Sequence, residues 1–101
     1  MEYSFSAPTQ NYVLNPAPDK VASDNPDRVG LIIQVKGGGV ASIKFGASIM
    51  TDINGITDGI EISGELSILE FCPTSSIFMR AEIASTIITL CEITKHERWF
   101  K

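Results

Sequence analysis

Histidine, cysteine and positive charge are all scarce in this sequence. Its 101 residues include one His and two Cys, which are too few for a disulfide scaffold and too few for a structural zinc site. Lys and Arg number 8 and Asp and Glu 12, so the net charge is −4 and the pI is about 4.8. A nucleic-acid-binding protein needs a basic surface to neutralise phosphates, so the acidic balance argues against that class.

The sequence also lacks long hydrophobic runs. No stretch of about 18 apolar residues is present, so we expect no membrane-spanning helix. The first residues include Glu2 and no apolar run of the kind that a secretory signal needs, so we expect synthesis in a reducing cytosol. Cys72 and Cys91 are therefore predicted to be buried free thiols, and a disulfide is the alternative.

Helical patterns are missing as well, whereas β-branched residues are abundant. Short apolar segments alternate with turns that contain glycine or proline, which is typical of a sandwich or barrel. The predicted fold class is all-β, a small antiparallel β-sandwich or jelly-roll-like barrel. The predicted strands are 29–36, 40–46, 58–63, 65–72, 76–82 and 84–94.

Proline divides the chain into three parts. Four of the five prolines lie in residues 1–27, and proline removes a backbone donor and fixes φ, so this part is predicted to be an extended arm. Short edge strands within it are expected at 12–14 and 20–22. Residues 28–94 are the predicted β-sandwich core, and residues 95–101 a basic, aromatic tail. A domain this small buries only about 60–65% of its unfolded surface, which favours oligomerisation or docking onto a larger partner.

The last predicted strand, 84–94, is apolar or neutral at both alternating sets of positions. A sheet with one face in water should show polar residues on that face, so the outer face of this strand needs a cover. A neighbouring subunit and the N-terminal arm are the two candidate covers. For the first alternative, we assign Thr86, Ile88 and Leu90 to a subunit interface.

Both ends of the chain carry aromatic residues that are candidates for partner binding. Residues 95–101 hold three cations and one carboxylate, net +2, so the rest of the chain carries −6. Aromatic residues and Arg dominate interface hot spots, so the tail is interpreted as a docking peptide, with a frayed end as the alternative. The candidate partner-binding residues are Tyr3, Phe5, Tyr12, Arg98, Trp99 and Phe100.

Few residues offer chemistry. His96 lies in the tail, where a catalytic group would not be held firmly, so we predict that the protein is not an enzyme and has no cofactor. Asp52, Asn54 and Asp58 are spaced somewhat like the ligands of a calcium loop, but the glycine and the third ligand that such a loop needs are missing. We therefore expect turns there and no metal.

One long region resembles small β-sandwich virion proteins of tailed bacteriophages, the capsid decoration (cement) and head-fibre-associated proteins. The resemblance covers residues 19–93. It is carried by Asn25-Pro26-Asp27-Arg28, the apolar strand that follows up to Gln34, Gly37-Gly38-Gly39, the strand 40–46 and the segments 64–71 and 77–81. Several members of this family have Asn after the glutamine, where this chain has Val35.

The resemblance implies a structural role in the virion without catalysis. The chain would be a capsid decoration protein that binds the major capsid protein on the capsid surface as a homo-oligomer, most commonly a trimer. Its arms would reach onto neighbouring molecules, which raises avidity through multivalent contact. A carbohydrate- or receptor-binding module of a tail or fibre is the alternative, because exposed aromatic rings can stack on sugars.

Overall fold

The structure, a computed structural model, describes residues 2–98, and these residues form β-strands joined by loops. Within this range there is no helix long and apolar enough to cross a membrane. Every strand predicted from residue 29 onward is present, with its ends shifted by at most four residues. The strands are β1 (Glu2–Ser6), β2 (Thr9–Leu14), β3 (Asp19–Ala22), β4 (Arg28–Val35), β5 (Val40–Phe45), β6 (Ile60–Ser63), β7 (Glu65–Ile68), β8 (Ile77–Arg80) and β9 (Thr86–Arg98).

Two antiparallel sheets form a β-sandwich, which confirms the predicted fold class. In one sheet β9, β4 and β7 are neighbours, and β1 and β2 pair one after the other along the free side of β9. The other sheet has the order β3–β8–β5–β6. Because β2 pairs with β9, β3 with β8, β4 with β7 and β5 with β6, the eight strands from β2 to β9 form a jelly roll, to which β1 is an addition.

Alternating side chains of the two sheets fill the core. In β4, Leu31 and Ile33 are fully buried and Val35 is nearly so, as the period of two in this segment predicts. They belong to the same cluster as Ile43 and Met79 of the opposite sheet, which are also fully buried. Burial of each such side chain stabilises the fold by about 1.5–3 kcal/mol.

Arg28 ties three segments together at the start of β4. Although it is charged, it is only 2% exposed. Its Nε donates to Oε1 of Glu92 over 2.7 Å, and its Nη atoms donate to the carbonyl oxygens of Ser23, Pro73 and Ser75 over 2.8–2.9 Å. The guanidinium thereby closes the end of the sandwich from which β9 continues outward.

The predicted arm, residues 1–27, is for the most part integrated into the sandwich. β2 and β3 are edge strands of the two sheets, and Leu14 (1% exposed) and Val21 (5%) belong to the core. The boundary placed before residue 28 is therefore wrong. The prolines of this region all lie in the connections between strands, so they leave the strands themselves free to pair.

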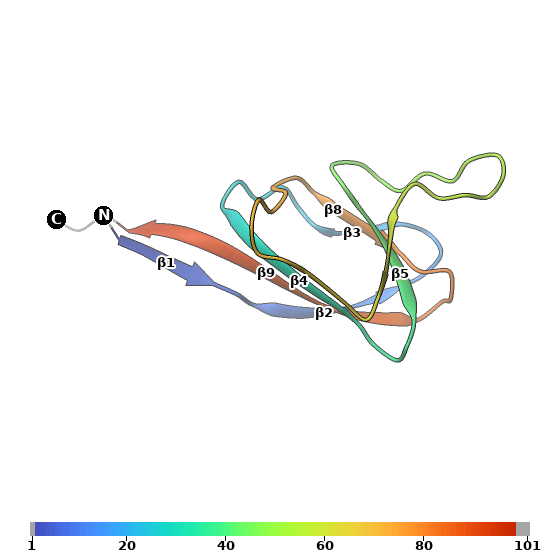
Figure 1. Cartoon of the computed structure of the whole chain (residues 1–101), viewed down its shortest axis with the longest axis horizontal. Coiled ribbons are helices and arrows are strands. Elements are labelled where there is room, and N and C mark those ends of the chain that lie inside the picture. The colour runs from blue at the N-terminus through green and yellow to red at the C-terminus, as the bar shows by residue number, and fades with distance from the viewer. Residues whose placement is uncertain (1, 99–101) are drawn as a thin grey trace.

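The molecule is elongated, with principal extents of 58 × 27 × 19 Å. β9 pairs with β4 as far as Thr94, which lies opposite Arg28, and then continues to Arg98. Beyond Thr94, its partner among the described residues is β1. β1 and residues 95–98 thus form a two-stranded ribbon that projects from one end of the sandwich (Figure 1).

Candidate functional site

The projecting ribbon has two different faces. Phe5 lies opposite Lys95 in the register, and Tyr3 shares their face. The Lys95 Nζ lies 3.8 Å from the centre of the Tyr3 ring, a cation–π contact. On the other face, Ser6 Oγ lies 2.9 Å from Nε2 of His96. One face therefore carries both aromatic rings and the Lys95 ammonium, and the other is polar.

Both aromatic rings of the ribbon are open to solvent. Tyr3 is 49% exposed and Phe5 is 64% exposed. A two-stranded ribbon without a packed layer behind it is marginally stable in water, and exposed aromatic rings are typical of protein-contact surfaces. The structure thus brings together Tyr3 and Phe5, two of the predicted partner-binding residues, on one candidate contact surface.

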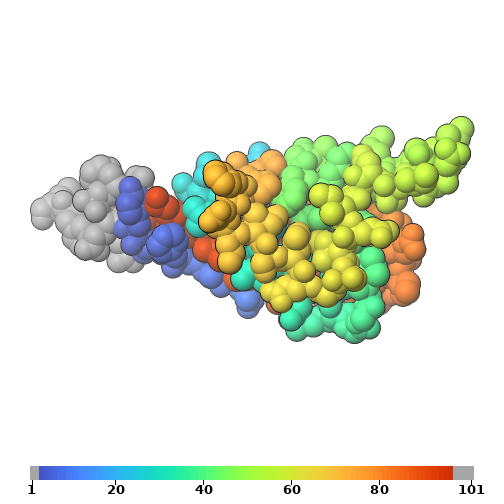
Figure 2. All heavy atoms as spheres, in the orientation of Figure 1, coloured from blue at the N-terminus to red at the C-terminus, as the bar shows by residue number. Residues whose placement is uncertain are grey.

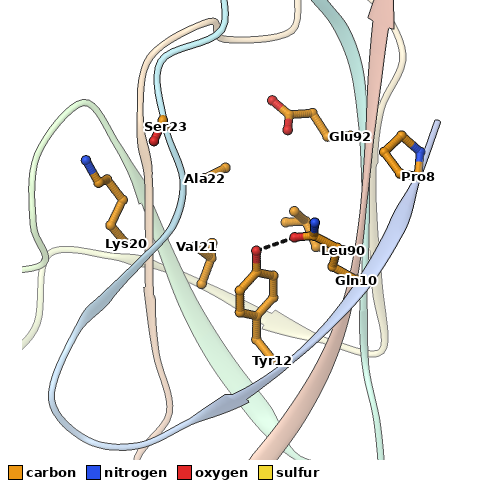
Figure 3. A pocket seen from close by; sticks show the side chains of 9 residues that line it. All are labelled: Pro8, Gln10, Tyr12, Lys20, Val21, Ala22, Ser23, Leu90 and Glu92. Carbon is orange, nitrogen blue, oxygen red and sulfur yellow. Dashed lines mark hydrogen bonds between the residues drawn. The ribbon is translucent and has the colours of Figure 1, made fainter. Parts of the chain in front are cut away.

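The other predicted partner-binding residues do not join them in the described part of the chain. Tyr12 points from β2 into a groove of about 300 Å³ between β2 and β3, beside Val21 and Leu90 (Figure 3). Its hydroxyl donates to Oε1 of Gln10 over 2.5 Å. Tyr12 therefore lies at the edge of the sandwich between β2 and β3 and does not belong to the ribbon. Arg98 is the last residue of β9 and lies in the ribbon, whereas Trp99 and Phe100 lie outside the described residues.

The predicted subunit interface on β9 is wrong. Thr86, Ile88 and Leu90 face the core of their own chain and are 9%, 0% and 3% exposed. The outer face of the sheet instead carries the odd-numbered residues, among them Ile87, which is 46% exposed. Both sets are largely apolar, so alternation alone could not assign them. Pairing with β2 and β4 fixes which set points inward.

An apolar hollow of about 340 Å³ lies at the end of the molecule opposite the ribbon. It lies between the β4–β5 hairpin and the β8–β9 connection, which Figure 2 shows in teal and orange at the end away from the blue ribbon. Ile83 (74% exposed) and Ile87 line one side of it. On the other side, Gly37 and Gly38 have φ angles of +70° and +74°, and no atom lies within 4 Å of the place that a Cβ would take.

A second hollow of about 280 Å³ adjoins the first and shares Ile83 with it. The carboxylate-bearing residues Glu61 and Glu82 line this second hollow together with Arg80. The guanidinium of Arg80 is already engaged, because its Nε donates to the carbonyl oxygen of Pro16 over 2.9 Å. The end of the molecule opposite the ribbon therefore combines an apolar part with an acidic part.

The carboxylates of the loop between β5 and β6 organise the loop itself. The Asp52 Oδ1 accepts hydrogen bonds from the backbone N–H groups of Asn54 and Ile56, as expected of a turn. Asp58 accepts a hydrogen bond from Nζ of Lys44 over 2.6 Å, and this contact is the main reason why the pKa of Asp58 lies below its usual value. Within residues 2–98 no three metal-ligating side chains come together.

Both cysteines are free, as predicted, and both are half-buried. Burial raises the pKa of the Cys72 thiol, and the nearby Arg28 guanidinium opposes this effect only in part. Cys91 lies on β9, where its Sγ is 3.6 Å from the carbonyl oxygen of Ala7 in the connection between β1 and β2. The two thiols belong to different surroundings and do not form a pair.

No protein-family model matches the chain. No curated protein matches it either. Among solved structures, the chain is similar to a protein of the Bacillus endospore appendages, described as a novel family of disulfide-linked pili. The two share 11% sequence identity with a TM-score of 0.62, over 96% of this chain and 89% of that chain. At this identity the likeness shows the fold alone, and the resemblance to phage virion proteins stays a prediction.

Proposed function

We propose that this chain is a structural subunit that assembles with copies of itself into an extended polymer. The observation that carries the proposal is the β1–β9 ribbon, which leaves the sandwich and exposes Tyr3 and Phe5. Such a ribbon adds contact surface that a small core cannot supply. The outer side of β1 is also unpaired within the described chain, and unpaired strand edges are a template for contacts with other molecules.

The shape and the fold support this proposal. A molecule 58 Å long and 19 Å thick is suited to repeat along an axis. The similar solved structure comes from pili, so a sandwich of this kind serves in a filament elsewhere. Those pili are disulfide-linked, and this chain has two free thiols, so reducing and non-reducing gels of the assembled form will show whether any link of this kind forms.

The proposal is tested on the purified full chain. We expect the sedimentation coefficient to increase with concentration and electron microscopy to show elongated particles. The variant Phe5→Ser should remain close to the 11.0 kDa monomer, because it removes an aromatic ring that is 64% exposed in the ribbon. The matched control is Phe71→Ser, which removes a ring that is 99% exposed elsewhere and should assemble like the wild type. A wild type that stays monomeric at millimolar concentration would overturn the proposal.

Capsid decoration is the second candidate, because the exposed ribbon is equally able to reach onto a different lattice protein. In that case the purified chain forms a closed oligomer such as a trimer, and it binds empty capsids. Deletion of residues 1–6 should then abolish capsid binding while the sandwich stays folded, because β1 lies outside the jelly roll. Polymers formed by the pure protein would favour the first candidate.

A further inference from the structure

We infer that the ribbon of one copy docks into the two adjoining hollows at the far end of the next copy. Tyr3 and Phe5 would then cover the apolar hollow at Ile83 and Ile87. Lys95, on the same face of the ribbon, would face the acidic hollow at Glu61. The inference rests on the proposed function and names the surface that receives the ribbon.

The first argument is the position of the two surfaces on one strand. β9 starts beside the apolar hollow at Thr86 and ends in the ribbon at Arg98. Its 13 residues span about 43 Å at about 3.3 Å per residue, which is most of the long axis of the molecule. The ribbon therefore cannot reach the hollows of its own chain. Two unlike surfaces at opposite ends make a head-to-tail contact, and a contact of this kind repeats into an open filament unless it closes into a ring.

The second argument is the match of apolar surfaces. The aromatic face of the ribbon is exposed, and so are Ile83 (74%) and Ile87 (46%) on the hollow. The backbone at Gly37 and Gly38 carries no side chain and has no atom within 4 Å of the Cβ position, so a flat ring can approach it closely. Docking would bury the apolar groups of both partners in one step.

The third argument is charge. Lys95 lies on the aromatic face of the ribbon, opposite Phe5, and its Nζ is 3.8 Å from the centre of the Tyr3 ring. In the acidic hollow, Glu61 and Glu82 have no hydrogen-bond or ion-pair partner in the described structure, whereas Arg80 is held by a backbone carbonyl. The Lys95 ammonium is thus attracted to this hollow, and such complementarity favours one orientation of docking.

The test uses two variants that each disable one surface. Phe5→Asp disables the ribbon and leaves the hollows intact, whereas Ile83→Asp does the reverse. Both side chains are highly exposed, so both variants should keep the wild-type circular dichroism and melting temperature. Each variant alone should sediment as the 11.0 kDa monomer. An equimolar mixture should give a dimer and nothing larger, because one working ribbon meets one working hollow.

A matched control is Ile53→Asp, which places the same change on a fully exposed isoleucine of the β5–β6 loop and should assemble like the wild type. Assembly of Ile83→Asp at the wild-type level would overturn the docking site while leaving the proposed function standing. Monomers in the mixture, with both single variants blocked, would show that Phe5 and Ile83 do not lie on opposite sides of one contact and would also overturn the docking site. A monomeric wild type would instead overturn the proposed function.

A crosslinking experiment keeps the inference testable if a charged variant is poorly folded. In a background with Cys72 and Cys91 replaced by serine, Phe5→Cys and Ile83→Cys chains are mixed under mild oxidation. We expect a disulfide-linked dimer for this pair and none for Phe5→Cys mixed with Ile53→Cys. Glu61→Gln should weaken the contact several-fold at low salt, and the effect should shrink at high salt. Equal crosslinking of both cysteine pairs would reject the docking site.

Discussion

Nε of Arg28 donates a hydrogen bond to Oε1 of Glu92 over 2.7 Å, which joins the first residue of β4 to β9. The side chain of Arg28 is fully buried, whereas that of Glu92 is 24% exposed. A buried charge is tolerated when it is paired and its remaining donors are satisfied. Here the carbonyl oxygens of Pro73 and Ser75 accept hydrogen bonds from the remaining donors of the Arg28 guanidinium. This contact fixes the point from which the ribbon leaves the sandwich.

Replacement of Arg28 by alanine should destabilise the fold by about 3–5 kcal/mol, because it removes the charge partner of Glu92, which keeps only the Asn25 amide as a donor, and leaves three part-buried carbonyl oxygens without their donor. Arg28→Lys should restore only part of the loss, since an ammonium cannot match the fork of a guanidinium. Urea denaturation at pH 7 measures both effects. Lys44→Ala breaks an exposed ion pair and is the control, with a much smaller expected shift in the midpoint. Equal midpoints for Arg28→Ala and Lys44→Ala would contradict this account.

Asp24 should make the stability depend on pH. Its Oδ1 accepts hydrogen bonds from Oγ and the backbone N–H of Ser76, and these bonds hold its pKa below the usual 3.8. Because the folded-state pKa is lowered, the contribution is complete above the unfolded value and is lost as the pH falls through the folded value. Asp24→Asn should therefore be less stable than the wild type at pH 6.

The same variant supplies its own check at acidic pH. The difference in unfolding free energy between Asp24→Asn and the wild type should narrow as the pH falls below about 4, where the carboxylate is protonated first in the unfolded chain and then, at lower pH, in the folded protein. A difference that stays constant from pH 6 to pH 2.5 would show that the hydrogen bonds to Ser76 do not depend on the charge of Asp24.

Most strands and the core could be predicted from the sequence, because apolar residues alternate with other residues along the strands. Leu31 and Ile33 alternate with less buried residues, and this pattern alone places them inward. β9 is different, since Ile88 and Ile87 are equally apolar and only the neighbouring strands decide which one is buried. A local pattern therefore identified the strand but could not orient it.

Only one half of the candidate site, the aromatic residues of the ribbon, could be predicted from the sequence. Tyr3 and Phe5 are recognisable as aromatic residues near an end of the chain. Ile83 and Gly37 are far apart in sequence, and the hollow between them exists only because the β4–β5 and β8–β9 connections meet at one end of the jelly roll. The burial of Arg28 likewise depends on carbonyl oxygens from distant segments, and no local pattern predicts it.

Cys72 should react slowly with thiol reagents in the folded protein. Burial raises its pKa, so at pH 8 a smaller fraction is thiolate, the reactive form, than in the unfolded chain. In the Cys91→Ser variant, which isolates this thiol, the reaction with an aromatic disulfide reagent should be several-fold slower in buffer than in urea. The rate in buffer should increase as the pH is raised. Equal rates in buffer and urea at pH 8 would show that Cys72 is not protected.

The backbone of Phe71 adopts a left-handed conformation, which residues with a large side chain rarely adopt. Its φ angle is +53° and its ring is 99% exposed, so the strained backbone is not offset by packing within the chain. Asparagine tolerates this left-handed region better, so Phe71→Asn should stabilise the fold by about 0.5–1 kcal/mol in urea denaturation.

The control for this change is Leu69→Asn, two residues earlier, at a position that is also exposed (62%) but has no positive φ angle. Leu69→Asn should leave the stability unchanged, because the backbone at this position is not strained and the substitution relieves nothing. Phe71→Asn should also assemble like the wild type, since the docking contact involves the ribbon and the far hollows. A gain in stability with a loss of assembly would place Phe71 in the interface, and the strain would then serve to present its ring to the neighbouring copy.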